Sequence, residues 1–152
     1  MASSGWGIVD FKDHRFHYIA HGCIVTKADA PRAERLYVIY QAFQETLHTY
    51  KPQEAAIETL FFSRNAKSAI PVAEARGVLS MALAEQGLPV REFSPNSIKL
   101  AVLGAGQAEK RQIQEMVRLI LGLQAIPKPD HAADALGAAI CCAHTLIPEA
   151  YV

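Results

Sequence analysis

Residues 54–59 read Glu-Ala-Ala-Ile-Glu-Thr and lie between two segments with helical patterns. The apolar centre of this stretch predicts a short strand, interrupted by the carboxylate of Glu58. A run rich in Ala, Val and Leu follows over residues 65–86 and predicts a long helix. Because proline costs about 3 kcal/mol inside a helix, a break or a late start is expected at Pro71. Residues 89–93 predict another strand, and the alternation of strands and helices is typical of an α/β fold.

The segment before this stretch predicts a hairpin and a helix. Residues 5–11 and 15–26 carry loosely alternating apolar residues on either side of the polar turn at residues 12–14. This pattern predicts two antiparallel strands. Apolar side chains recur at three- and four-residue steps over residues 30–50, which predicts an amphipathic helix that ends before Pro52.

The segment after it predicts three more helices. Ser94 is a capping residue followed by proline, so it opens the first of them. The second is expected over residues 108–123, and the third runs from a capping Asp130 to about Leu146. The whole order predicts a single domain over residues 1–152. We expect an α/β fold in which a mixed β-sheet carries helices on both faces.

Composition limits the functions that this chain can have. Of its 152 residues, 51% are apolar and 20% charged, which is enough to fill one core. Fifteen basic residues balance fifteen acidic ones, so any attraction to nucleic acid must come from a local patch. No run reaches the roughly 18 apolar residues of a membrane span, and the start lacks a secretory signal, so no membrane contact is expected. Three cysteines without zinc-type spacing predict reduced thiols in a cytoplasmic protein.

Two acidic features could carry chemistry. Glu58 ends an apolar strand, and strand ends are where sites gather in α/β folds; the alternative is a carboxylate turned to solvent. Residues 130–134 read Asp-His-Ala-Ala-Asp at the start of the last helix, where His131 and Asp134 share one face. Near Glu58, they would form an oxygen-rich site for Mg²⁺ or Mn²⁺. The alternative is that both acids of this segment serve the helix dipole.

Two basic segments suit a nucleic acid. Two glycines at residues 104–106 precede a helix with Lys110 and Arg111 near its start, which favours phosphate contacts. A helix–helix turn with solvated charges is the alternative. Residues 61–67 read Phe-Phe-Ser-Arg-Asn-Ala-Lys, and one exposed ring beside the basic side chains would stack on an unpaired base. The alternative is that both rings pack in neighbouring cores.

Five blocks of sequence stand in an order that one known family shares. They are Ala56-Ile57-Glu58-Thr59-Leu60-Phe61-Phe62, Asn65-Ala66-Lys67-Ser68-Ala69, Ala75-Arg76-Gly77-Val78, residues 99–110 and His131-Ala132-Ala133-Asp134-Ala135-Leu136. Together they resemble the RuvC family of bacterial Holliday-junction resolvases over nearly the whole chain. The resemblance implies a ribonuclease H-like fold. It also implies a homodimer that cuts two opposed strands of a four-way DNA junction in recombination and repair, using a divalent metal.

The resemblance implies roles for particular residues. Glu58 and Asp134 match metal-binding carboxylates, and His131 falls where the family carries a catalytic Asp or His. The expected cofactor is Mg²⁺, with Mn²⁺ able to substitute. For DNA binding, Phe61 matches the family's wedge at the junction centre, and Lys99 and Lys110 match its basic residues near the scissile phosphate. The basic segments described above add Arg64, Lys67 and Arg111 to the expected DNA-binding residues.

The resemblance also implies partners. The homodimer is expected to form through the helix at residues 65–86, where Val72, Ala75, Leu79 and Leu83 are spaced as an apolar stripe. A branch-migration complex is the other expected protein partner, beside the four-way junction itself.

The start of the chain departs from the family. Family members begin with a strand that ends in Gly-Ile-Asp-Pro-Gly, whose Asp is the first metal ligand, whereas Met1–Val9 resembles the segment just after it. The missing strand should lie between residues 5–11 and 55–58, and without it we expect a poorly soluble, nearly inactive chain. A non-catalytic junction-binding dimer is therefore the alternative function. A nuclease that acts on RNA–DNA hybrids is a third and more distant alternative. A wedge at Phe61 suits a branched substrate better than a continuous duplex.

Overall fold

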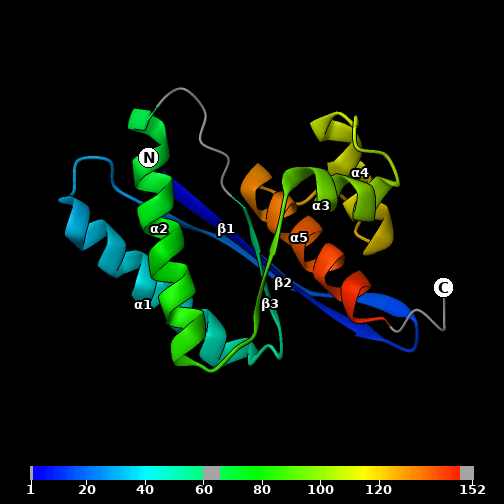
Figure 1. The fold of residues 1–152 in the computed structure, drawn as a ribbon, viewed down its shortest axis with the longest axis horizontal. Coiled ribbons are helices and arrows are strands. Elements are labelled where there is room, and N and C mark those ends of the chain that lie inside the picture. Colours follow the sequence, from blue (N-terminus) through cyan, green and yellow to red (C-terminus); the bar gives the residue numbers. More distant parts are fainter. Residues whose placement is uncertain (1, 60–65, 148–152) are drawn as a thin grey trace.

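The computed structural model describes residues 2–59 and 66–147 (Figure 1). Of the predicted DNA contacts, Phe61 and Arg64 lie outside the described residues, and only the backbone of Lys67 is described. The candidate site described below therefore consists of Glu58 and residues beyond position 68.

A long hairpin opens the chain. Strand β1 (Ala2–Lys12) pairs antiparallel with β2 (Arg15–Thr26), with one register shift between Ile8 and Val9. The turn residues Asp13 and His14 have φ angles of 53° and 60°. Positive φ at both central residues is typical of the two-residue turns whose twist matches that of the strands. The predicted hairpin is confirmed.

The second pair of strands is parallel. Strands β3 (Ala55–Glu58) and β4 (Val90–Phe93) are connected through α2 (Ala66–Glu85), with Glu58 opposite Phe93 in the register. The α/β prediction is confirmed, with antiparallel and parallel pairing both present. Within residues 2–59 and 66–147, however, the strands are hydrogen-bonded as two separate sheets, β1–β2 and β3–β4.

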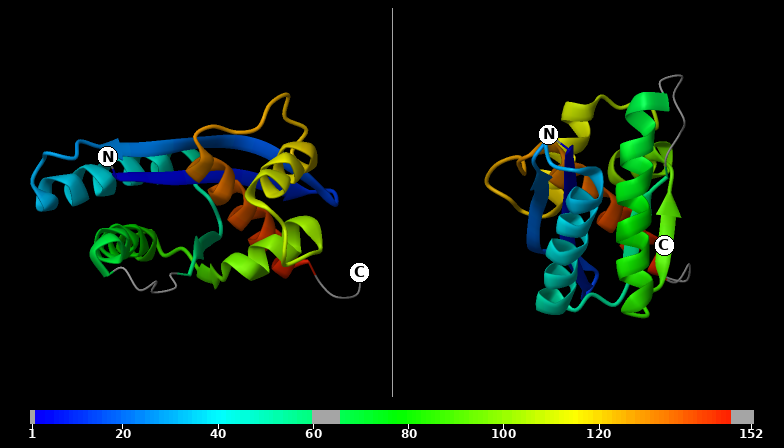
Figure 2. Two further views of the ribbon diagram at one scale, coloured as in Figure 1. Left: turned by 90° about the horizontal axis from the view of Figure 1, so that it is seen from above. Right: turned by 90° about the vertical axis from the view of Figure 1, so that its left-hand side faces the viewer.

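Helices cover both faces of the hairpin (Figure 2). The Trp6 ring lies 5.7 Å from the ring of Tyr50, which ends α1 (Arg32–Tyr50). Gly5 and Gly7 lie against α5 (Asp130–Leu146). Because successive residues of a strand face opposite sides, α1 and α5 must lie on opposite faces. This arrangement confirms the predicted layers.

The main core is built around α5. Its Leu136 and Ile140 are fully buried, as is Val117 of α4 (Lys110–Ile120). Helix α3 (Pro95–Leu103) adds Ile98 and Val102 to the same cluster. A smaller core lies between α1 and α2. Its buried members are Leu47, Ala82 and Leu83.

Several local signals in the sequence are confirmed. The Ser94 hydroxyl accepts a hydrogen bond from the Ser97 N–H at 3.0 Å, as a capping residue should. Cys141 and Cys142 are buried and free, which agrees with their place in an apolar run. None of the helices that the structure describes is long and apolar enough to cross a membrane.

Other expectations need correction. Helix α2 continues through Pro71, which lies near its start, so no break occurs there. The expected interface stripe on α2 is also wrong in part, because Leu83 is buried in the smaller core whereas Val72 is 50% exposed. The exposed apolar residues of this helix include Ile70, Val72 and Met81. A stripe read from spacing alone cannot tell which side of the helix already packs against α1.

Candidate active site

Glu58 and Asp134 come together from distant parts of the chain. Glu58 is exposed at the end of β3, and Asp134 lies in the second turn of α5. The pKa of Glu58 is raised, first because surrounding atoms desolvate its carboxyl group and second because the negative charge of Asp134 is near. Two carboxylates within electrostatic reach repel each other, and a cation between them would relieve that repulsion.

Lys110 supplies a positive charge to this acidic pair. Its Nζ atom lies 3.5 Å from Oδ2 of Asp134 and 3.5 Å from Oδ2 of Asp130. The charges of Lys110 and then Lys99 act against the raised pKa of Glu58. A lysine in the first turn of a helix opposes the helix dipole, so this position does not serve the stability of α4. The place of Lys110 is explained by the carboxylates it faces.

A local cap fixes where α4, and hence Lys110, begins. The Glu109 side chain accepts from the N3 backbone N–H, and the Glu109 N–H donates to Oε1 of Gln112 at 2.8 Å. This capping box starts the helix at Lys110, two residues after the expected start at residue 108. The arrangement brings the lysine to the end of the helix that faces α5.

Asp130 has a different role from the one predicted. The residue before the first turn of α5 is Pro129, and no side chain caps that end. The Asp130 carboxylate instead accepts from Lys128 at 3.4 Å and pairs with Lys110. These contacts, the Lys128 hydrogen bond first, lower the pKa of Asp130. The sequence could show only that Lys128 and Asp130 are close in the chain, and it could not reveal the contact with α4.

His131 and Arg111 flank this group. His131 is exposed in the first turn of α5, and its backbone carbonyl lies against Gly5 of β1. Arg111 is also exposed; the pKa of Glu115, one turn further along α4, is lowered first by the hydrogen bond from Arg118 and last by the charge of Arg111. Sequence reasoning missed Gly5, because a glycine in a strand carries no sign of what lies opposite.

The carboxylates of the candidate site are suited to a divalent cation, but they are few. Among the residues that the structure describes, no three His, Cys, Asp or Glu side chains are grouped so as to hold a metal ion. The part of the site that fits such an ion is the carboxylate pair of Glu58 and Asp134, whose oxygen atoms suit Mg²⁺. The predicted third member, His131, does not complete a group of three with them.

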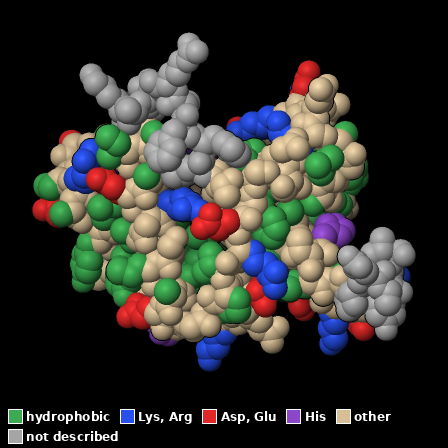
Figure 3. Space-filling model, in the orientation of Figure 1, with side chains coloured by type: hydrophobic (Ala, Val, Ile, Leu, Met, Phe, Trp, Pro, Cys, Tyr) green, Lys and Arg blue, Asp and Glu red, His purple; other side chains and the backbone are tan. Residues whose placement is uncertain are grey.

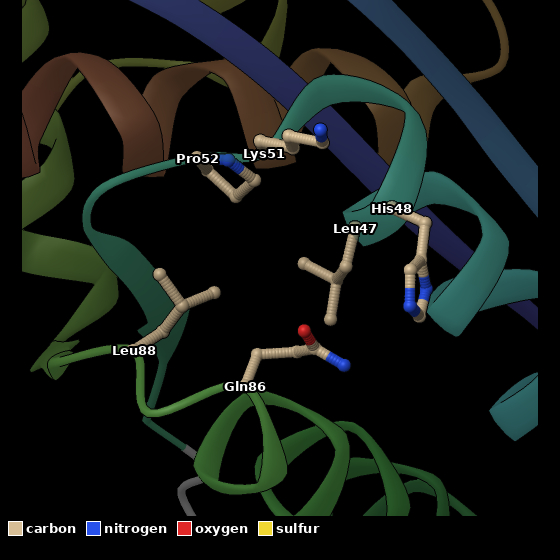
Figure 4. A pocket seen from close by; sticks show the side chains of 6 residues that line it. All are labelled: Leu47, His48, Lys51, Pro52, Gln86 and Leu88. Atoms are coloured by element: carbon tan, nitrogen blue, oxygen red, sulfur yellow. The ribbon is translucent and has the colours of Figure 1, made fainter.

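A cavity of about 250 Å³ lies elsewhere, between the end of α1 and the turn after α2 (Figure 4). Its lining residues are Leu47, His48, Lys51, Pro52, Gln86 and Leu88. Pro52 and Leu88 precede β3 and β4, whereas Glu58 ends β3. The cavity is therefore at the opposite end of this sheet from the acidic pair.

The surface around these elements is mixed in charge. Figure 3 shows basic and acidic side chains interspersed, with apolar side chains gathered where α1 and α2 lie in Figure 1. Exposed apolar residues on these helices include Tyr37, Val38, Ile70 and Val72. The start of α5 thus carries a cluster of charged side chains, and an apolar region lies on the α1–α2 side.

Fold and site together define a class, the ribonuclease H-like α/β proteins, here with one carboxylate at the end of a strand and one on a helix. The Thermus thermophilus RuvC structure matches with a TM-score of 0.85 and 34% identity, over 93% of this chain and 87% of that one. The structure of T. thermophilus RuvC in complex with Holliday junction substrate also matches with a TM-score of 0.85, at 31% identity over the same shares.

Sequence relatives identify the family. The family model for crossover junction endodeoxyribonuclease RuvC matches residues 1–142. The protein of that name from Treponema denticola is 54% identical over 140 residues, which are 92% of this chain and 79% of the relative. The one from Heliobacterium modesticaldum is 46% identical over 145 residues, 95% of this chain and 90% of the relative. This chain belongs to the RuvC family.

Proposed function

We propose that this chain is one nuclease domain that resolves four-way DNA junctions by hydrolysing phosphodiester bonds in two opposed strands, in recombination and repair. Family membership supports the activity, because the relatives are crossover junction endodeoxyribonucleases. The substrate class is supported by the T. thermophilus relative, which is described with a Holliday junction. The observation that carries the proposal is the pairing of Glu58 with Asp134 beside Lys110.

Each residue of the pair has a role in this proposal. Glu58 and Asp134 hold a divalent cation, Mg²⁺ or in its place Mn²⁺, through their carboxylate oxygens. The chemistry that such an ion supplies is neutralisation of the phosphate charge and activation of a water. Lys110 and Lys99 offset further phosphate charge. His131, exposed in the first turn of α5, would orient or deprotonate the water.

DNA binding and assembly complete the proposal. Phe61 stacks on a base at the junction centre, and the basic residues around it and near α4 contact phosphates. Those basic residues are Arg64, Lys67 and Arg111. The protein acts in the cytoplasm beside a branch-migration complex. It does so as a homodimer, because a junction offers two equivalent strands and one chain has one site. The exposed apolar side chains Ile70 and Val72 of α2 favour this helix as the contact between subunits.

One observation favours a second candidate function. Because the described residues hold no group of three metal-binding side chains, the carboxylate pair alone binds a cation less tightly than a fuller donor set. Weaker cation binding favours a dimer that binds four-way junctions without cutting them. The two candidates differ in one measurable property, which is metal-dependent cleavage.

The test uses Glu58→Gln and Asp134→Asn on one synthetic four-way junction. Each change removes a charge from the site while Lys99, Lys110 and Arg111 remain, so cutting should fall at least about 100-fold while binding changes less than about twofold. Nicking assays with and without Mg²⁺, gel shifts and sedimentation of the same samples measure cutting, binding and dimer formation.

The matched control is Glu45→Gln, which changes an exposed carboxylate on α1 in the same way. It should leave cutting and binding unchanged. Full cutting by Glu58→Gln or Asp134→Asn would contradict the site assignment. A parent chain that binds junctions as a dimer but cuts none at any Mg²⁺ concentration would support the non-catalytic candidate instead.

A further inference from the structure

Helix α5 approaches the backbone of β1 very closely at Gly5. A methyl carbon built on Gly5 would overlap the backbone carbonyl of His131 and lie 2.7 Å from the Ala132 amide nitrogen. Contacts of a real Cβ below 3.0 Å essentially never occur in proteins. Gly5 is in a regular strand and has no positive φ, so alanine would meet no backbone strain there. The requirement for glycine comes entirely from the helix opposite.

Contacts on the other face of β1 oppose a movement of the strand that would relieve such an overlap. On the other face of β1, the Trp6 ring fills the space over Gly22, where an added Cβ would lie 2.6 Å from Cζ2. The same ring contacts Tyr50 of α1, with centroids 5.7 Å apart. Strand β1 is further held by its ladder to β2. A side chain at position 5 would therefore displace the start of α5 and leave β1 in place.

The start of α5 carries the charged groups of the site. His131 makes the contact itself, and Asp134 lies within one turn of it. Asp134 is close enough to Glu58 to raise its pKa, and it pairs with Lys110 at 3.5 Å. This end of the helix has no side-chain cap. A shift of its first turn would change the distance from Asp134 to both partners.

We propose that Gly5 is a positioning residue: its missing side chain sets the depth at which the first turn of α5 sits on β1, and so the separation of Asp134 from Glu58. The inference rests on the proposed function, because that separation matters only if the two carboxylates share a cation. Mg²⁺ and Mn²⁺ sites need well-placed oxygens, and a displacement of about 1 Å near reacting groups can cost about 100-fold in rate.

The test compares Gly5→Ala with Ile140→Ala in the full chain. Ile140→Ala opens a cavity in the buried part of α5 and lowers stability without touching its start. Three quantities are measured for each: the Kd for Mn²⁺ by calorimetry, junction binding without metal by gel shift, and the cutting rate at saturating junction.

Gly5→Ala should weaken Mn²⁺ binding at least about tenfold and slow cutting about 100-fold, with junction binding within about twofold of the parent. Ile140→Ala should lose thermal stability but keep Mn²⁺ affinity while folded. Equal Mn²⁺ affinity in Gly5→Ala and the parent would overturn the proposal. So would an equal loss in Gly5→Ala and Ile140→Ala, since the effect would then be general destabilisation.

The Mn²⁺ measurement separates this proposal from the proposed function. A parent that binds Mn²⁺ but cuts no junction contradicts the nuclease activity, while the comparison of Mn²⁺ affinities still decides the role of Gly5. A parent that neither binds Mn²⁺ nor cuts overturns both.

Discussion

The start and the middle of α5 are held by different forces. At its start, Asp130 and Asp134 remain open to water, with side chains 49% and 41% exposed, and are tied to Lys110 by ion pairs at 3.5 Å. Further along, Leu136 and Ile140 are fully buried. Exposed ion pairs contribute about 0–1 kcal/mol each, whereas burying one large apolar side chain contributes several times that. The buried part therefore supplies most of the free energy that holds the helix, and the ion pairs at its charged start add little.

The buried part of the helix gives the largest expected effect. Ile140→Ala should lower the free energy of unfolding by about 2–5 kcal/mol, because it removes contacts and leaves a cavity in the main core. For a chain of this length, each kcal/mol lowers the Tm by about 2–4 °C. Leu146→Ala is the matched control on the same helix, since Leu146 is 43% exposed, and it should cost less than about 1 kcal/mol. Equal losses in chemical denaturation would contradict the comparison.

Glu58 should make stability depend on pH to a smaller extent. Its folded pKa is raised above the ordinary 4.5 by desolvation and by Asp134, so the folded state binds its proton more tightly than the unfolded state does. The contribution of the protonated Glu58 carboxyl to stability is complete below the pKa that Glu58 has in the unfolded chain. It is lost as pH rises through the higher pKa that Glu58 has in the folded protein. Glu58→Gln should remove this loss. Denaturation of parent and variant between about pH 4 and pH 8 measures the difference, and Glu45→Gln should follow the parent.

Lys110→Gln should change stability least. The lysine side chain is 54% exposed, so losing its two ion pairs should cost less than about 1 kcal/mol. The same change should raise the pKa of Glu58 further, because Lys110 acts to lower it. Carboxyl ¹³C NMR titration of Glu58 measures this shift. Arg111→Gln is the neighbouring control and should leave Glu58 nearly unchanged; a fall in the Glu58 pKa in Lys110→Gln would show that the charges are arranged differently.

Much of the fold follows from local patterns in the sequence. The hairpin about Asp13 and His14, the strand that ends at Glu58 and the Ser94 cap depend on residues close together in the chain. Alternation, helical spacing and capping act over a few residues, so they can be read without knowing what packs nearby. The family blocks likewise point to Glu58, Asp134 and Lys110 because each keeps its local motif.

Which distant segments those residues contact depends on the tertiary structure. Spacing placed Leu83 on an exposed stripe, but α1 buries it. Local patterns predicted Asp130 as a helix cap, but its carboxylate forms ion pairs with Lys110 and Lys128 instead. Gly5 reads as an unremarkable strand glycine until the backbone of His131 is found against it. These contacts join segments far apart in the chain, and their existence depends on how helices and strands pack, which no short stretch of sequence contains.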